Sequence, residues 1–130
     1  VLIDDYAHHP EELNALISGV RSIYPGEKMV LVFQPHLYSR TQDQCDSFVE
    51  SLNKADEVIL LPIYPARELP IEGVTSDMLI EKMSIEHKQV LSKEALFEWA
   101  AKTQDKLIVM AGAGDIDACI IKVKDILSHS

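Results

Sequence analysis

Short apolar runs alternate with segments of helical periodicity along this chain, and this alternation constrains the fold more than any other feature. The run MVLVF at residues 29–33 contains no polar position, which is typical of a strand buried on both faces of a parallel sheet. Parallel strands are joined by right-handed crossovers, usually helices, that cover both faces. We therefore predict an α/β fold, Rossmann-like and doubly wound, with a mostly parallel sheet and helices on both faces. Further strands are expected at residues 1–4, 57–61, 89–91 and 106–110.

The helices are predicted from apolar residues that recur at three- and four-residue spacing. Pro10 opens the first helix and is followed by two glutamates near the positive end of the helix dipole. Residues 34–40 are expected to form a loop, after which Thr41 caps the second helix. A short helix is expected over residues 76–83, and Ser92 is expected to cap the next one. The side chains expected to face the core are Leu13, Leu16, Ile17, Val20, Cys45, Phe48, Val49, Leu52, Leu96, Trp99, Ile116, Cys119, Ile120, Val123 and Leu127.

Charge and hydropathy exclude two classes of partner. The formal net charge of the chain is −9, whereas nucleic-acid-binding proteins attach to the phosphate backbone through clustered Lys and Arg. No apolar stretch approaches the roughly 18 residues of a membrane-spanning helix. Neither a nucleic acid nor a membrane is therefore expected as a partner.

Cys45 and Cys119 fall on apolar helix faces, where we expect reduced thiols of a cytoplasmic protein.

The length of the chain fits one domain over residues 1–130, which can bury roughly two-thirds of the surface that the unfolded chain exposes. The first strand begins at Val1, without an initiating methionine or a polar segment before it. We therefore expect a single domain taken from a longer protein, whose other parts complete any site at its surface.

Polar clusters follow several of the predicted strands. The densest is DDYAHH at residues 4–9, and others occupy residues 34–40, 62–68 and 111–115. The proline-rich stretch at residues 62–70 is unusually long for a connection between a strand and a helix, which favours a functional role. Because ligands of such folds bind at the carboxyl ends of the strands, we expect the four clusters to converge at one edge of the sheet.

Two familiar kinds of phosphate site fit the sequence poorly. A response-regulator receiver domain needs a phospho-accepting aspartate after its third strand and a lysine after its fifth strand, where this chain has LP at residues 61–62 and AG at residues 111–112. The GAG sequence at residues 112–114 precedes a helix but lacks the third glycine of a dinucleotide-binding fingerprint. We interpret it as a tight turn rather than a phosphate-binding loop.

A metal site could be assembled from the three histidines His8, His9 and His36 together with Asp4 or Asp5, because imidazole and carboxylate groups suit zinc or iron. Adjacent histidines rarely both reach one ion, and no His-x-x-x-His spacing supports them. We therefore predict no metal ligand. For His8 or His9 taken alone, a hydrogen bond to the loop backbone is as good an interpretation as a role as a metal ligand.

Arg40 is a stronger candidate for binding an anion. The planar guanidinium group pairs with a carboxylate or phosphate through two parallel hydrogen bonds, and the predicted fold places Arg40 at the same edge as His36 and Tyr6. Tyr64 and Arg67, in the proline-rich stretch, are weaker candidates of the same kind. The residues alone thus indicate a site for a small anionic ligand.

Four motifs in one order resemble a known family. They are DDYAHHP at residues 4–10, FQPHLYSRT at residues 33–41, IYPARE at residues 63–68 and GAGDI at residues 112–116. Together they resemble the C-terminal domain of the UDP-N-acetylmuramate:L-alanine ligases, a branch of the Mur ligase family, over nearly the whole chain. The resemblance implies the closing, third domain of an ATP-dependent, amide-bond-forming ligase of bacterial peptidoglycan biosynthesis.

In that family ATP phosphorylates the muramate carboxylate, the amine of L-alanine attacks the acyl phosphate, and phosphate leaves. The phosphate-binding loop and the Mg²⁺ ligands belong to the central domain, while the N-terminal domain binds the UDP group. The resemblance therefore implies that ATP, UDP-N-acetylmuramate, L-alanine and the central domain of the same protein are partners of this chain. It also implies that the chain holds no catalytic residue and is inactive alone.

The motifs also carry residue roles. The resemblance implies that Asp5 faces the nucleotide and that Arg40 pairs with the carboxylate of L-alanine. The chemistry of the side chains agrees, because a guanidinium group suits a carboxylate and a neutral histidine can help to hold or deprotonate the amine near pH 7. Members of the family often have a second arginine where this chain has Leu37, so the carboxylate is left to Arg40 and His36. The residues expected around L-alanine are Tyr6, His8, His36 and Arg40.

Two other interpretations remain open from the residues alone. One is a stand-alone α/β module that uses the same edge to bind a small ligand or a protein. The other is a free-standing metalloenzyme.

Overall fold

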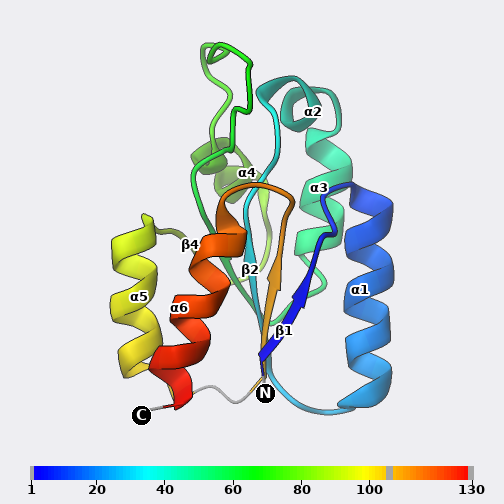
Figure 1. Cartoon of the computed structure of the whole chain (residues 1–130). Coiled ribbons are helices and arrows are strands. Elements are labelled where there is room, and N and C mark those ends of the chain that lie inside the picture. The colour runs from blue at the N-terminus through cyan, green and yellow to red at the C-terminus, as the bar shows by residue number, and fades with distance from the viewer. Residues whose placement is uncertain (1, 105–106, 129–130) are drawn as a thin grey trace.

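Five parallel strands form a single sheet (Figure 1). The computed structural model describes residues 2–104 and 107–128, so Val1 and Lys106, which were expected in strands, lie outside the described residues. The strand order is β1-β5-β2-β3-β4, and every pairing is parallel. The predicted α/β class and parallel sheet are confirmed. The strands are β1 (Leu2–Asp5), β2 (Met29–Phe33), β3 (Glu57–Leu60), β4 (His87–Val90) and β5 (Leu107–Ala111).

The helices cover both faces of this sheet, as the doubly wound prediction requires. On one face lie α1, α3 and α4, and on the other face lie α5 and α6 (Figure 1). The short helix α2 sits beyond the sheet, at the end where the strands finish (Figure 1). The helices are α1 (Pro10–Ile23), α2 (Tyr38–Asp43), α3 (Cys45–Leu52), α4 (Ser76–Lys82), α5 (Lys93–Lys102) and α6 (Ile116–Ser128).

Alternation along each central strand produces two apolar cores. In β2, Met29, Leu31 and Phe33 pack under α1 and α3, whereas Val30 and Val32 face α5 and α6. All five of these side chains are fully buried. Because both faces of the strand are covered, a run without polar residues is what the burial of β2 requires.

The start of the second helix was predicted wrongly. Thr41 does not cap it, because α2 already begins at Tyr38 with Leu37 in the N-cap position. Thr41 is instead buried within the helix, where its hydroxyl donates a hydrogen bond of 2.8 Å to the carbonyl of Leu37. A break at Gln44 then separates α2 from α3. Three of the seven residues of the loop expected over residues 34–40 are therefore helical.

The polar segments lie at the carboxyl end of the sheet, above the strands in the view of Figure 1. The backbone N–H of Gln34 donates to the carbonyl of Ala111, and that of Gly112 donates to the carbonyl of Asp5, so the segments after β1, β2 and β5 are bound together. The predicted convergence of the clusters at one edge is confirmed.

Among the described residues, no helix combines the length and the apolar character that are needed to span a membrane.

Candidate functional site at the carboxyl edge

The segments that follow β2 and β3 are joined beyond the sheet by a short parallel bridge. His36 and Tyr64 form an isolated β-bridge, in which the N–H of Leu37 donates to the carbonyl of Tyr64 over 2.8 Å. The His36 and Tyr64 rings stack with their centroids 5.5 Å apart. Leu37 and Ala66 next to this bridge have positive φ angles of 71° and 53°, which non-glycine residues adopt at a cost of about 1–3 kcal/mol. Strained backbone is thus concentrated at this edge.

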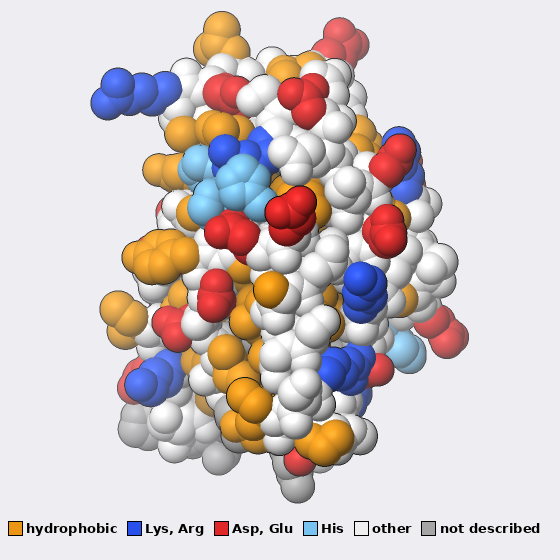
Figure 2. All heavy atoms as spheres, turned by 90° about the vertical axis from the view of Figure 1, so that its right-hand side faces the viewer, with side chains coloured by type: hydrophobic (Ala, Val, Ile, Leu, Met, Phe, Trp, Pro, Cys, Tyr) orange, Lys and Arg blue, Asp and Glu red, His pale blue; other side chains and the backbone are white. Residues whose placement is uncertain are grey.

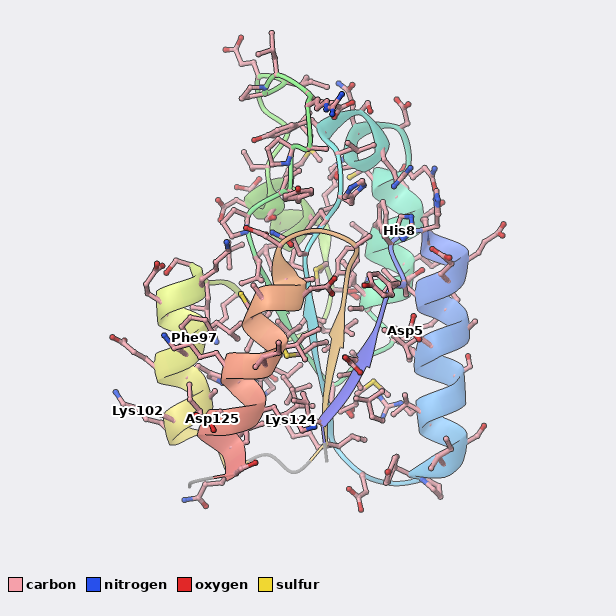
Figure 3. All side chains as sticks on the ribbon, in the orientation of Figure 1. Asp5, His8, Phe97, Lys102, Lys124 and Asp125 are labelled. Atoms are coloured by element: carbon pink, nitrogen blue, oxygen red, sulfur yellow. The ribbon has the colours of Figure 1, made fainter. Side chains whose placement is uncertain are left out.

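His8 is fixed by two groups from its own segment. Its Nδ1 atom lies 2.7 Å from the carbonyl oxygen of Tyr6 and 3.5 Å from Oε1 of Glu12. The same Glu12 oxygen accepts the backbone N–H groups of His8 and His9 over 3.1 and 3.0 Å. These backbone hydrogen bonds, that of His8 first, lower the pKa of Glu12. Figure 3 shows His8 above the end of β1, beside the start of α1.

His36 and Arg40 form a pair one helical turn apart. Nη1 of Arg40 lies 3.2 Å from Nδ1 of His36, and the His36 ring meets the His8 ring edge-on with centroids 5.7 Å apart. Burial, and then the positive charge of Arg40, lower the pKa of His36 below its ordinary value of 6.5. His36 is therefore neutral at physiological pH. In Figure 2 a patch of histidine side chains adjoins the side-chain atoms of Lys or Arg, and a further histidine lies apart from it on the right.

Glu68 anchors the helix that carries Arg40. Its carboxylate accepts the backbone N–H of Ser39 over 3.1 Å and also the hydroxyl of Ser39. The hydroxyl and then the N–H of Ser39 lower the pKa of Glu68, so the carboxylate is ionised at neutral pH. The long connection after β3 is in this way tied to the first turn of α2.

Two predicted site residues point elsewhere. The carboxylate of Asp5 accepts the N–H of Ala7 over 2.8 Å and lies lower than His8, at the end of β1 (Figure 3). The side chain of Tyr6 is 67% exposed, and its hydroxyl hydrogen-bonds with Asp117 in the first turn of α6, which raises the pKa of Tyr6. The structure brings His8, His36 and Arg40 together, while Asp5 and Tyr6 border that group.

The turn after β5 is closely packed. A Cβ atom at Gly114 would lie 2.5 Å from Cγ of Tyr64 and 2.8 Å from Oε1 of Gln34. Gln34 is almost fully buried, and its amide donates to the carbonyl of Pro62 and to Asp115 and accepts the N–H of Ile116. Protein atoms therefore occupy the space that a side chain would need at Gly114. The interpretation as a tight turn fits this packing.

Asp115 is the hydrogen-bonding partner of Lys93 at the same edge. Burial would raise the pKa of Asp115, but the hydrogen bonds from Lys93 and Gln34 outweigh it and lower the pKa. The positive charge of Lys93 is thus already balanced by a carboxylate. Gln34, Lys93 and Asp115 also line a cavity of 260 Å³ between the loop after β3 and the start of α5.

Among the described residues, the side chains that lie close enough together to coordinate a cation differ from the set considered from the sequence. Ligand atoms of His8, His9 and Glu12 lie within 4.8 Å of one another. Glu12 already serves two backbone N–H groups through one oxygen, and His8 already uses Nδ1. Glu12 and His8 are therefore already engaged in hydrogen bonds that stabilise the loop after β1.

Glu12, Ser39, Gln34 and Glu68 were missed in the sequence. Glu12 had a local signal, because a glutamate three residues after a helix N-cap is half of a capping box. Ser39 and Glu68 are separated by 29 residues, and Gln34 and Ile116 by 82 residues, so no short-range pattern connects them.

A sequence model of the family described as "Mur ligase, glutamate ligase domain" matches residues 1–114. The UDP-N-acetylmuramate–L-alanine ligase of Flavobacterium johnsoniae is 49% identical over 130 residues, which are 100% of this chain and 29% of that ligase. The enzyme of the same name from Cytophaga hutchinsonii is 52% identical over 124 residues, 95% of this chain and 27% of its own length. The chain thus spans less than a third of these relatives.

Solved structures share the fold. The UDP-N-acetylmuramate–alanine ligase of Thermotoga maritima has a TM-score of 0.75 at 23% identity, covering 98% of this chain and 26% of that one. A murein peptide ligase from Psychrobacter arcticus has a TM-score of 0.75 at 21% identity, covering 99% of this chain and 28% of that one. At these identities the likeness supports the architecture alone.

Proposed function

The chain belongs to the Mur ligase family through its glutamate ligase domain, and we propose that it is the C-terminal domain of a bacterial UDP-N-acetylmuramate:L-alanine ligase. The relatives of that name match it at 49–52% identity with only 27–29% of their length. The remaining N-terminal and central domains would therefore complete a cytoplasmic enzyme of peptidoglycan biosynthesis. The alternative, a stand-alone binding module, accounts less well for the finding that the relatives are longer proteins named as ligases.

The observation that carries this proposal is the group formed by His8, His36 and Arg40. The two rings and the guanidinium group lie at the carboxyl edge of the sheet, where α/β folds bind ligands. A guanidinium group beside two imidazole rings suits a small molecule that carries a carboxylate and an amine. L-alanine is such a molecule, and its side chain is only a methyl group.

The phosphates of ATP and the Mg²⁺ ion fit this chain poorly. The glycine-containing turn at residues 112–114 is filled by Tyr64 and Gln34, and Lys93 is paired with Asp115. We place the binding of the phosphates and of Mg²⁺ in the central domain. Asp5 would then contact only the outer part of the nucleotide, at the end of β1.

The reaction assigns a simple task to this domain. Once the muramate carboxylate has been phosphorylated, the domain would hold L-alanine with its carboxylate on Arg40 and its amine directed at the acyl phosphate. Holding a nucleophile in a reactive orientation accelerates its attack because the entropy of encounter has already been lost. Leu37 has no positive charge to offer, so Arg40 and His36 would bind the carboxylate without a second arginine.

The first test is Arg40→Ala in the longer ligase. We expect the KM for L-alanine to rise roughly 10- to 100-fold, since hydrogen bonds to charged groups contribute about 1.5–3 kcal/mol. The KM for ATP should change little. Steady-state kinetics with UDP-N-acetylmuramate, ATP and varied L-alanine measure both constants.

Lys124→Ala is the control, because Lys124 is an exposed basic residue on α6 that lies at the opposite end of the molecule from α2 (Figure 3). Its KM for L-alanine should equal that of the unaltered enzyme. An unchanged KM in Arg40→Ala would remove the amino acid from this site and leave the proposed function without its main support.

A further inference from the structure

The hydrogen-bonding partners of His8 determine which of its nitrogens carries the proton. Nδ1 lies 2.7 Å from the carbonyl oxygen of Tyr6, and a carbonyl oxygen can only accept a hydrogen bond. Nδ1 of His8 must therefore be protonated. In the neutral ring, Nε2 then has a free lone pair and acts as an acceptor.

The opposite holds for His36. Its Nδ1 lies 3.2 Å from Nη1 of Arg40, and a guanidinium group can only donate. Nδ1 of His36 must therefore carry the lone pair, so Nε2 carries the proton and acts as a donor. The two rings meet edge-on with centroids 5.7 Å apart, which is direct ring contact, so a small bifunctional molecule would bind across the two rings rather than between them.

Resting on the proposed function, we infer that His8 and His36 are held as opposite tautomers, so that Nε2 of His8 accepts from the substrate amine while Nε2–H of His36 and the guanidinium group of Arg40 donate to the substrate carboxylate. The site then distinguishes the two ends of an α-amino acid by hydrogen-bond polarity. His36 cannot serve as a base while Arg40 occupies its only lone pair.

His8 is equipped to take up a proton, and His36 is not. At neutral pH L-alanine arrives as an ammonium ion. One N–H bond of that ion breaks, the proton forms a new N–H bond at Nε2 of His8, and the electron pair stays on the substrate nitrogen for attack on the acyl phosphate. The resulting positive charge on His8 lies beside Glu12, whose Oε1 is 3.5 Å from Nδ1. A positive charge on His36 would instead face Arg40.

Nuclear magnetic resonance of this chain with ¹⁵N-labelled histidine tests the tautomers directly, because a protonated and an unprotonated ring nitrogen differ widely in ¹⁵N shift. We expect the proton of His8 on Nδ1 and the proton of His36 on Nε2. In Arg40→Ala, His36 should lose its single tautomer and show averaged shifts, while the remote His87 on β4 stays unchanged as an internal control. A proton on Nε2 of His8 or on Nδ1 of neutral His36 would overturn the inference.

A kinetic test in the longer ligase uses two substitutions that each keep one nitrogen position. The side-chain amide of His8→Asn can still donate to the carbonyl of Tyr6 but has no distal acceptor, whereas His8→Gln restores a distal polar atom. We expect His8→Asn to lower kcat roughly 100-fold or more, as losses of general base catalysis do. The loss should shrink as pH rises and solvent deprotonates L-alanine. His8→Gln should bind L-alanine better than His8→Asn does.

A loss of kcat that is equal at all pH values would overturn the role of His8 as proton acceptor. These outcomes are separable from failure of the proposed function. If Arg40→Ala leaves the KM for L-alanine unchanged, the proposed function fails although the tautomers can still be as inferred. If the spectrum shows the wrong tautomers, the inference fails whatever the kinetics show.

Discussion

Gly114 stands at the closest approach between the segment after β5 and the ring of Tyr64. Its missing side chain leaves room for Tyr64, which in turn stacks on His36. The turn was predicted from the sequence because glycines permit sharp changes of direction. The reason for a glycine at this particular position could not be predicted, since Tyr64 approaches from a distant segment of the chain, between β3 and α4.

Substitution of Gly114 should therefore disturb both stability and the site. In Gly114→Ala the added methyl group would clash with Tyr64, and overpacking of this kind costs about 1–3 kcal/mol. We expect a lower free energy of unfolding in urea denaturation and a changed environment of the His36 ring in its NMR spectrum.

Gly19→Ala is the matched control for that measurement. Gly19 lies within α1, and no atom comes within 4 Å of the position that an added methyl group would take. The substitution should therefore stabilise the helix by about 0.5–1 kcal/mol. Equal effects of the two substitutions would show that close packing against Tyr64 is not what requires glycine at position 114.

At the scale of elements, the connection after β3 and helix α2 act as one unit. Glu68 in that connection binds both the N–H and the hydroxyl of Ser39 at the start of α2, and Arg40 follows directly. A helix of six residues is too short to be stable through its own hydrogen bonds. The orientation of Arg40 therefore depends on an anchor supplied by a distant part of the chain.

Glu68→Gln should loosen α2 and raise the KM for L-alanine in the longer ligase. Hydrogen–deuterium exchange of this chain should show faster exchange of the amides in α2, while the central strands keep their protection. Glu50→Gln, an exposed glutamate on α3, serves as the control. Unchanged exchange at α2 in Glu68→Gln would mean that the neighbouring backbone alone holds the helix.

The same anchor has a defined pH dependence. Because the folded-state pKa of Glu68 is lowered from 4.5, the contribution of this carboxylate to stability is complete above pH 4.5. This stabilisation is lost as the pH falls through the lowered pKa, because the protonated carboxyl group accepts the two hydrogen bonds from Ser39 less strongly than the carboxylate does. The protection of the α2 amides, measured relative to their intrinsic exchange rates at each pH, should accordingly fall in that acid range in the unaltered chain, and it should fall much less in Glu68→Gln.

The elements of this fold were predictable to the extent that their signals are local. The apolar run of β2 identified a strand covered on both faces, and Ser92 was correctly expected as the cap of α5, where it accepts the N–H of Ala95. The start of α2 was missed because its anchor, Glu68, is remote in sequence. Thr41 satisfied the local rule for a cap but is buried inside the helix.

For the whole molecule, the balance of charge limits what this chain can do alone. Its net charge of −9 opposes the approach of ATP and of a UDP-sugar, both of which are anions. At the carboxyl edge Arg40 contacts His36 and Lys93 is paired with Asp115. Under the proposed function, most of the cations that neutralise the phosphates would therefore come from the remaining domains of the longer ligase.

We accordingly predict that the isolated chain neither hydrolyses ATP nor ligates, although its five-stranded sheet is covered on both faces. Incubation with ATP, Mg²⁺, UDP-N-acetylmuramate and L-alanine should release no phosphate above background, while the longer ligase under the same conditions should. The physical reason is that orientation of L-alanine accelerates only the attack on an acyl phosphate, and the proposed function assigns the formation of that intermediate to the missing domains. Release of phosphate by the pure chain would show that the phosphate-binding groups lie within these 130 residues and that the division of labour between domains is different.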